Sequence, residues 1–277
     1  MSSRRLVSST MSVLTCLSAI VAVLPLLLIL GFLLVKGASA VNLDFFLHLP
    51  KPVGEPGGGV ANAIVGSLVM IGLAVAVGLP IGISGGVYLA DSRDRHLPWA
   101  VRFIADVLNG VPSIVVGIFA YTLVVLPMRR FSALAGGLAL GFILIPIVLR
   151  TTEEMVRLVP NALREAGLGL GIPRWRVTLR IVLPAARAGI LTGVMVAVAR
   201  IAGETAPLLF TALGNRFWHQ GLDQPIAALP LQIYAYAIAP YDDWHRQAWA
   251  GALVLITLVF LASLAARVAT RGRTIAH

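Results

Sequence analysis

Two charged residues four positions apart, Arg200 and Glu204, lie inside an apolar segment and are the side chains best suited to recognising a charged solute. A charge at the centre of a bilayer costs at least about 2.5–3.5 kcal/mol on insertion scales, so such residues by default face a cavity or a partner. On a helix, positions four apart lie nearly one above the other. An arginine fork can donate two parallel hydrogen bonds to a tetrahedral oxyanion. The pair therefore predicts a site through which an anion is translocated.

Glu204 gives this predicted site a basis for selectivity. Its carboxylate could orient the arginine and accept the proton of a partly protonated phosphate, whereas sulfate carries no such proton. The alternative interpretation is an ion pair within the helix that only neutralises itself. An exposed pair of this kind is worth about 0.3–0.5 kcal/mol, which does not recover the insertion cost. We therefore favour a translocation role for Arg200 and Glu204. Gly203 to Pro207 predicts a kink near the middle of the bilayer, because Pro207 cannot donate a helical hydrogen bond.

The rest of the sequence assembles no catalytic, cofactor or metal site. Cys16 is the only cysteine, and the histidines are scattered without ligand spacing. The chain has no Gly-x-x-x-x-Gly-Lys-Ser/Thr phosphate loop, and its only lysines are Lys36 and Lys51. We therefore predict no enzyme activity, no catalytic residue, no cofactor and no bound metal.

Composition predicts the elements that must position these charges. The chain is 58% hydrophobic and only 12% charged, against roughly 25% charged residues in a soluble domain. Runs of about 20 apolar residues are long enough to cross the hydrocarbon region as helices. Six such segments are expected, at 13–35, 62–90, 101–127, 131–150, 189–213 and 247–268. The predicted fold is therefore an all-α polytopic membrane bundle of six transmembrane helices, forming one domain over residues 1–277.

The first two of these segments are unusual in composition. The second segment is rich in glycine and contains Pro80, so we expect it to be kinked or partly outside the lipid. The first follows Arg4-Arg5 and precedes Ala38-Ser39-Ala40, which imitates a cleavable secretory signal. Its apolar run exceeds the 7–15 residues typical of such signals, so we favour a retained first helix.

The formal charge of +10 is a topology signal. Arginine is concentrated at both ends of the chain and in the segments after 90 and after 150. By the positive-inside rule, these parts and both termini are predicted to be cytoplasmic. Anionic lipid head groups are a lesser expected partner, and no nucleic acid is expected. The predicted outer loops are 36–60 and 214–246, and we favour an interfacial belt over a docking surface for the aromatic residues of the second.

The segment 157–184 predicts a short helix-turn-helix between two spans. Pro160 suits the start of a helix, and Gly171 suits the left-handed turn that ends it. Leu163, Ala166, Gly167 and Leu170 share one face by the i, i+3, i+4, i+7 pattern, and two of them are small enough for a partner's backbone to approach. The alternative is an amphipathic hairpin that rests on the membrane surface.

The spacing of this segment carries a family resemblance. Glu165-Ala166-Gly167, Gly171 and, nine residues later, Ile181-Val-Leu183-Pro184 resemble the coupling loop of ABC importer permeases. In that family the third position is usually alanine, and Gly167 is a mild departure. The resemblance implies that Glu165, Ala166, Gly167, Gly171, Leu183 and Pro184 contact an ATPase subunit on a separate chain.

Further segments narrow the resemblance. Ala199-Arg200-Ile-Ala-Gly-Glu204-Thr-Ala-Pro207 is similar to the fifth-helix signature of phosphate-specific ABC permeases of the PstA kind. Other matching segments include Gly86–Asp91, Gly110–Gly117, Ile145–Glu154 and Leu229–Tyr234. The likeness extends over a permease core of about 60–268. It implies a type I ABC importer permease in a bacterial cell membrane that imports inorganic phosphate by alternating access.

The same resemblance implies the partners. They are a second, PstC-like permease, two copies of an ATP-binding subunit and an extracytoplasmic phosphate-binding protein. The alternatives are an ABC permease for sulfate, molybdate or another oxyanion, a secondary anion carrier, and a membrane enzyme. A carrier gives no reason for the hairpin, and an enzyme would need catalytic groups that the sequence does not assemble.

Overall fold

A computed structural model describes residues 2–53, 55, 57–92, 94 and 96–271 of the chain. Five helices in this part are long and apolar enough to cross a membrane. A sixth crossing exists if two helices joined at a sharp bend are counted together. The predicted all-α membrane helix bundle is confirmed, and the described residues give the predicted six crossings when the bent pair counts as one.

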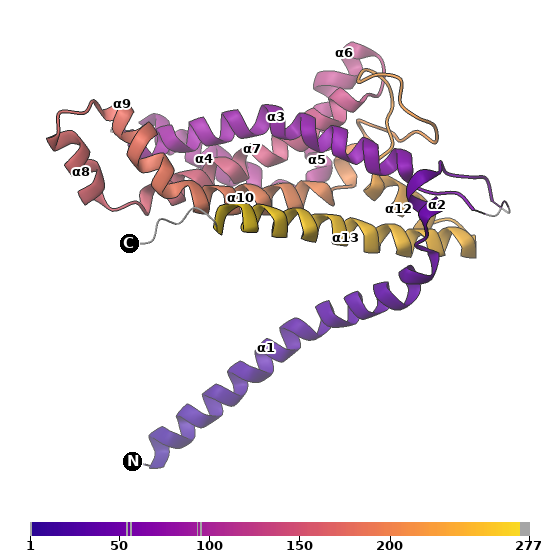
Figure 1. The fold of residues 1–277 in the computed structure, drawn as a ribbon, viewed down its shortest axis with the longest axis horizontal. Coiled ribbons are helices and arrows are strands. Elements are labelled where there is room, and N and C mark those ends of the chain that lie inside the picture. Colours follow the sequence, from indigo (N-terminus) through magenta and orange to yellow (C-terminus); the bar gives the residue numbers. More distant parts are fainter. Residues whose placement is uncertain (1, 54, 56, 93, 95, 272–277) are drawn as a thin grey trace.

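The long helices other than α1 lie side by side along the longest dimension of the molecule, and α1 diverges from them (Figure 1). They are α1 (Ser2–Gly37), α3 (Ala61–Asp91), α7 (Ala133–Arg157), α10 (Leu183–Ala202) and α13 (Asp242–Arg271). The shorter elements are η1 (Ala38–Ala40), α2 (Leu43–Leu47), α4 (His96–Gly110), α5 (Ser113–Ala120), η2 (Tyr121–Val125), α6 (Leu126–Met128), α8 (Asn161–Gly169), α9 (Arg174–Val177), η3 (Thr178–Val182), α11 (Ala206–Leu209) and α12 (Leu229–Ala237).

The α3 and α7 helices form the centre of the bundle, and glycines allow them to approach closely. A Cβ atom on Gly82 would lie 2.8 Å from the Cβ of Val148, and one on Gly86 would lie 2.5 Å from the Leu149 carbonyl oxygen. Small residues at such contacts let two helix backbones pack together in a membrane. The segment that was predicted to be kinked or partly outside the lipid forms one continuous helix, α3, whose glycines serve packing.

The third predicted segment, 101–127, is not a single helix. It divides into α4 and α5, which are bent by 106° at the break. The break falls at Val111 and Pro112, because the residue before a proline is disfavoured in the helical region. After α5 the chain passes through the π-helical turn η2 into α6.

The bounds of the fourth and fifth segments also differ from the prediction. The α7 helix does not end at 150 but continues to Arg157, so Arg150 belongs to a helix and not to the loop. The fifth helix is continuous from Arg174 through α9 and η3 to Ala202, and it ends well before the predicted residue 213. Residues 206–209 form the separate helix α11.

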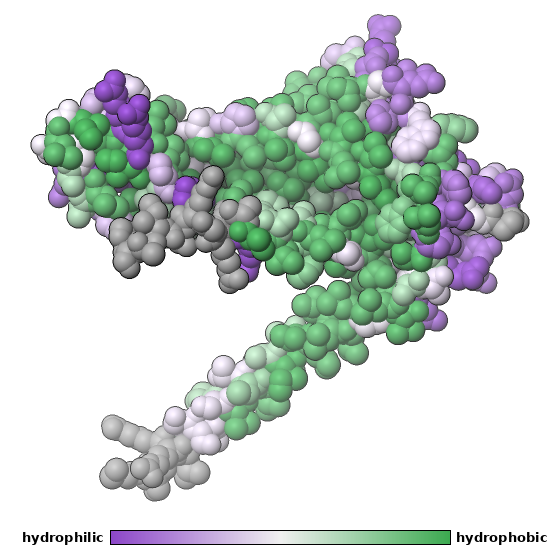
Figure 2. Space-filling view, in the orientation of Figure 1, coloured by the Kyte–Doolittle hydropathy of each residue, from purple (hydrophilic) through white to green (hydrophobic). Residues whose placement is uncertain are grey.

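The surface has the apolar middle and polar ends expected of a membrane protein. Hydrophobic side chains cover the long helices, and hydrophilic ones gather at the hairpin of α8 and α9 and at the opposite end (Figure 2). Over 13–35 most of the exposed side chains of α1 are apolar, and near its end Phe32 packs edge-on against Trp249 of α13 at 5.0 Å. Its retention remains a prediction. Arg93, Arg95 and Arg273, which contributed to the predicted charge asymmetry, lie outside the described residues.

Candidate functional site

The predicted helix-turn-helix exists and is closed by a Schellman turn. Within the turn, the Gly171 N–H donates to the Leu168 carbonyl and the Ile172 N–H to the Gly167 carbonyl. Gly171 has a φ of +76°, a left-handed conformation in which a side chain is disfavoured. The predicted turn at Gly171 is therefore confirmed, and it sets the angle between α8 and α9.

Gly167 faces the inside of this hairpin. It is buried, and a Cβ atom there would lie 2.9 Å from Cδ1 of Ile181 and 3.0 Å from Cγ2 of Val177. Gly167 was predicted to let a partner's backbone approach closely, but it faces the second arm of the same hairpin and is already covered. Its small size instead allows the two arms of the hairpin to pack against each other.

The outer side of the hairpin is exposed and partly apolar. Glu165 and Ala166 are exposed. The exposed fractions of Leu163, Leu170 and Trp175 are 43%, 79% and 60%. These residues form a surface that a partner could cover, and the hairpin projects from the end of the bundle (Figure 1).

Leu183 and Pro184 lie where the second arm becomes α10. The Leu183 N–H donates to the Thr178 carbonyl, five residues back, which makes η3 a π-helical turn. Pro184 has no N–H to bond the Arg180 carbonyl, and wider turns of this kind accommodate such a gap. The hairpin's second arm is thus continuous with a membrane-spanning helix, so a displacement of the arm acts directly on α10.

Arg200 and Glu204 flank the end of α10. Arg200 lies in the last turn of the helix, and Gly203 ends it. The Arg200 Nε and the Glu204 Oε1 are 4.0 Å apart, with side-chain exposures of 55% and 16%. At that distance the self-neutralising ion pair is loose, and the guanidinium faces outward from the chain's own core. The structure brings the two predicted residues together.

The chain beyond this pair does not kink as predicted but breaks. Pro207 is buried in α11 and packs against α5, where a Cβ atom on Gly117 would lie 2.6 Å from the Pro207 Cα. The segment that carries Glu204 is therefore held between α10 and the bent α4–α5 pair. Break points of this kind, rather than continuous helices, commonly form substrate sites in transporters.

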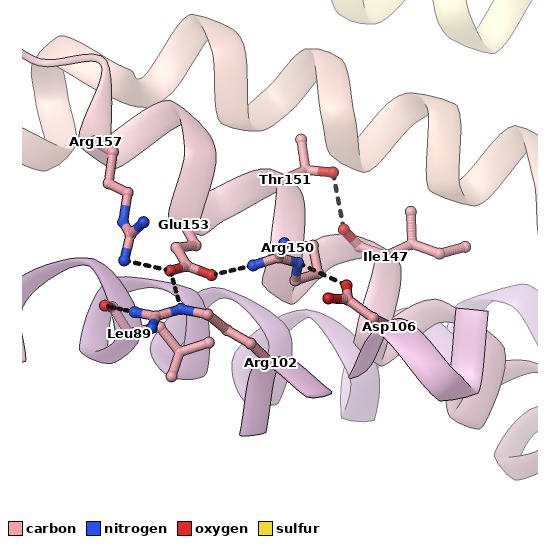
Figure 3. Close-up of polar contacts among 8 residues, drawn as sticks. All are labelled: Leu89, Arg102, Asp106, Ile147, Arg150, Thr151, Glu153 and Arg157. Carbon is pink, nitrogen blue, oxygen red and sulfur yellow. Dashed lines mark hydrogen bonds and ion pairs between the residues drawn. The ribbon is translucent and has the colours of Figure 1, made fainter. Parts of the chain in front are cut away.

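A second charged cluster lies on α4 and α7, and it was not predicted from the sequence. Glu153 is 1% exposed and forms ion pairs with three arginines, Arg102 at 2.6 Å, Arg150 at 2.7 Å and Arg157 at 2.8 Å (Figure 3). Arg150 also contacts Asp106 of α4 at 2.9 Å. Arg102 of α4 donates to the Leu89 carbonyl of α3 as well, at 2.9 Å.

This Glu153 cluster joins α3, α4 and α7. The sequence signal was the spacing of Arg150, Glu153 and Arg157 at i, i+3 and i+7, which places all three on one helical face. The signal was missed because the apolar run ends at 150 and the later residues were assigned to a loop.

The aromatic residues of 214–246 divide into two groups. Tyr236 is 3% exposed and stacks on Trp244 at 4.7 Å between ring centroids, and burial raises the pKa of its phenol. Tyr241 packs edge-on against the same Trp244 at 5.5 Å. Phe217 is 73% exposed. Part of the predicted aromatic belt is thus internal packing, and Phe217 belongs to the surface.

A bundle of membrane-spanning helices, a projecting hairpin continuous with one of them and a charge pair at a helix break define a multi-pass membrane permease. Residues 78–274 match the family described as "Binding-protein-dependent transport system inner membrane component". The chain belongs to this family. The resemblance to ABC importer permeases is therefore confirmed.

Two relatives are similar in sequence to most of the chain. It is 48% identical over 266 residues to a protein of Xylella fastidiosa (strain 9a5c), covering 95% of this chain and 92% of that protein. It is 49% identical over 234 residues to a protein of Yersinia pestis, covering 84% and 79% of the two chains. Both relatives are named "Phosphate transport system permease protein PstA".

Solved structures show the same fold at low sequence identity. The methionine ABC transporter MetNI, in an inward-facing conformation, has a chain that matches with a TM-score of 0.62 and 19% identity, over 77% of this chain and 94% of that one. A bacterial ABC transporter involved in the import of the acidic polysaccharide alginate matches with a TM-score of 0.55 and 15% identity, over 98% and 97%. The predicted importer-permease fold is therefore confirmed.

Proposed function

We propose that this chain is the transmembrane permease subunit of an ATP-driven importer that moves inorganic phosphate into the cytoplasm by alternating access. The observation that carries the proposal is the 46–49% identity, over most of the chain, to proteins named as phosphate transport permeases. Their similarity extends through the segment that contains Arg200 and Glu204. A permease for another oxyanion would need a different selectivity at this segment.

The hairpin of α8 and α9 is the proposed contact with a separate ATP-binding subunit. Its exposed outer side, with Glu165, Ala166, Leu163 and Leu170, supports this assignment. Closure of the ATPase dimer would displace the hairpin, and α10 would follow because the second arm continues into it. Gly171 holds the angle of the hairpin, and Gly167 packs its two arms together. Leu183 and Pro184 lie at the start of the driven helix.

Arg200 and Glu204 are the proposed contacts for phosphate during translocation. The Arg200 guanidinium is exposed and only loosely paired, so it can donate to an oxyanion without first breaking a strong ion pair. The Glu204 carboxylate can accept a hydrogen bond from the hydroxyl of a monohydrogen or dihydrogen phosphate. No covalent step is needed, and the exposed position of Arg200 allows release of the anion.

The assembly and orientation follow from the same proposal. The chain pairs with a second, PstC-like permease and two copies of the ATP-binding subunit, and an extracytoplasmic phosphate-binding protein delivers the solute. Both termini and the hairpin are cytoplasmic. The start of α1, the end of α13 and the hairpin lie toward the same end of the molecule, which supports this orientation (Figure 1).

The test is uptake of labelled phosphate by proteoliposomes that contain the reconstituted complex and internal ATP. We expect accumulation against a gradient that requires ATP, the binding protein and the ATP-binding subunit, and that excess sulfate does not suppress. Uptake without ATP would indicate a secondary carrier. Equal suppression by sulfate would indicate a broader oxyanion permease.

A further inference from the structure

Asp91 is the last residue of α3 and contacts both arms of the hairpin. Its Oδ1 accepts from the Arg164 guanidinium on α8, and its Oδ2 accepts from the Thr178 hydroxyl in η3. A single carboxylate therefore joins one membrane-spanning helix to the two sides of the turn. The side chains of Asp91 and Arg164 are only 31% and 21% exposed, so salt screens this ion pair less than it would a surface pair.

Arg164 extends the same connection to α7. Its second terminal nitrogen donates to the Val156 carbonyl at 2.9 Å, one residue before the end of α7. A cation suits the negative end of a helix dipole, and carbonyls in the last turn lack helical partners. Asp91, by contrast, places an anion at the end of α3, where the same dipole disfavours it. Its position is therefore not explained by the stability of α3 alone.

The contact lies where α3 and the hairpin leave a space between them. A crevice of 730 Å³ lies between them, lined on α3 by Ser84, Val87 and Tyr88 and on the hairpin by Leu168, Trp175 and Leu179. Because of this open space, apolar packing between these facing surfaces is incomplete. Asp91, Arg164 and Thr178 also line this crevice, and their contacts join its two sides.

Movement passed to α3 would also reach α7. The two helices are packed through Gly78, Gly82 and Gly86, at distances that leave no room for a side chain. Close packing of this kind transmits a displacement rather than absorbing it. The pair would therefore move together when the hairpin is pulled at Asp91.

We propose that Asp91 is a positioning residue for transport, which links the hairpin to α3 so that ATP-driven movement reaches the α3–α7 pair as well as α10. This inference rests on the proposed function, because it assumes that an ATPase moves the hairpin. The carboxylate needs both oxygens for the link, one for each arm. Loss of the Asp91 charge should weaken this link, so that the hairpin moves without an equal displacement of α3.

The experiment compares Asp91→Asn with wild type in the reconstituted complex. ATP hydrolysis and phosphate uptake are measured on the same proteoliposomes, and assembly is followed by co-purification of the ATP-binding subunit. We expect assembly and hydrolysis to persist, while phosphate moved per ATP falls at least about fivefold, the lower end of energetic coupling between linked sites. The control is Asp94→Asn, because Asp94 contacts the His96 backbone N–H and an asparagine oxygen can replace it.

A charge exchange separates a link from simple stabilisation. Asp91→Arg alone places two cations together and should uncouple transport more severely. Combining it with Arg164→Asp restores an ion pair and should recover part of the phosphate moved per ATP. If the double variant regains the stability of wild type but not the phosphate moved per ATP, the proposal is overturned. An unchanged amount of phosphate moved per ATP in Asp91→Asn would also overturn it.

Failure of this inference is distinguishable from failure of the proposed function. If the wild-type complex imports phosphate with ATP and Asp91→Asn does so with equal efficiency, only the Asp91 link is wrong. If the wild-type complex, with all subunits present, does not import phosphate, the proposed function itself is wrong.

Discussion

Two groups of charges in this chain differ in how completely they are paired. Glu153 is buried and surrounded by three arginines within 2.8 Å, and the cluster joins three helices. Arg200 is 55% exposed, and the charged atoms of its Glu204 partner lie 4.0 Å away. Buried charges that are fully paired hold helices together, whereas a loosely paired charge at a helix break remains available to a solute. Variants of the Glu153 cluster should therefore lose stability, and variants of Arg200 should lose transport.

The largest effect should come from removing the charge of Glu153. In Glu153→Gln three guanidinium groups lose their shared carboxylate, and breaking a buried ion pair costs about 3–5 kcal/mol. The thermal midpoint of the purified protein in detergent should fall strongly, and yield should fall with it. Glu154→Gln is the control, because that neighbouring side chain is exposed and the change should be within about 1 kcal/mol. Equal midpoints for the two variants would refute the structural role of the cluster.

Arg200→Ala should have the opposite signature. Phosphate uptake should fall to background, while the thermal midpoint and the assembly of the complex stay as in wild type. The control is Arg130→Ala, since Arg130 has a similar exposure of 54% but is paired with Asp223 at 2.9 Å. Undiminished uptake in Arg200→Ala would remove this residue from the translocation path.

A third prediction tests whether packing supports the same helices as the Glu153 cluster. Gly82→Leu forces a side chain against Val148 of α7, and overpacking of this kind costs about 1–3 kcal/mol. The midpoint should fall, and less than in Glu153→Gln. Gly72→Leu is the matched control, because a Cβ atom there has open space. A Gly82 variant as stable as the Gly72 variant would show that α3 and α7 are not held by close contact.

Glu204→Gln should change selectivity more than rate. The amide loses the ability to act as a charged acceptor for the phosphate proton, and a hydrogen bond to a charged group is worth about 1.5–3 kcal/mol. We expect the preference for phosphate over sulfate in uptake to fall by about tenfold, equivalent to about 1.4 kcal/mol. An unchanged preference would assign selectivity elsewhere.

The most local effect should appear at the hairpin turn. Gly171→Ala places a side chain in a left-handed conformation at a cost of about 1–2 kcal/mol. The loss is local to the hairpin, so binding of the ATP-binding subunit should weaken modestly while the bundle's midpoint stays near that of wild type. Gly169 is the last residue of α8 and has open space around it, so Gly169→Ala should bind at least as well as wild type.

Local rules predicted the turn but not its packing. The left-handed conformation of Gly171 follows from its position after a short helix and before Pro173, both of which are visible in the sequence. The burial of Gly167 depends on the side chains of Val177 and Ile181, which the turn brings back against α8. The helical periodicity of α8 alone could not show that Gly167 is covered by these side chains.

Apolar segments predicted the membrane class, but charges and prolines set the true bounds. The α7 helix extends to Arg157 because its polar end is neutralised by residues from α4 that are distant in sequence. The bend at Pro112 was concealed by apolar residues on both sides of it. The sequence predicted that Arg200 and Glu204 lie close together, and they do, but the helix ends between the two residues because Gly203 and Pro207 terminate it.

The central claim is that a separate ATPase drives this permease through the outer side of the hairpin. Leu170 tests it most directly, because its side chain is 79% exposed and a charge there should leave the fold unchanged. In Leu170→Arg we expect the thermal midpoint of wild type, together with loss of ATPase attachment and of ATP-driven phosphate uptake. Full attachment and full uptake in this variant would contradict the account.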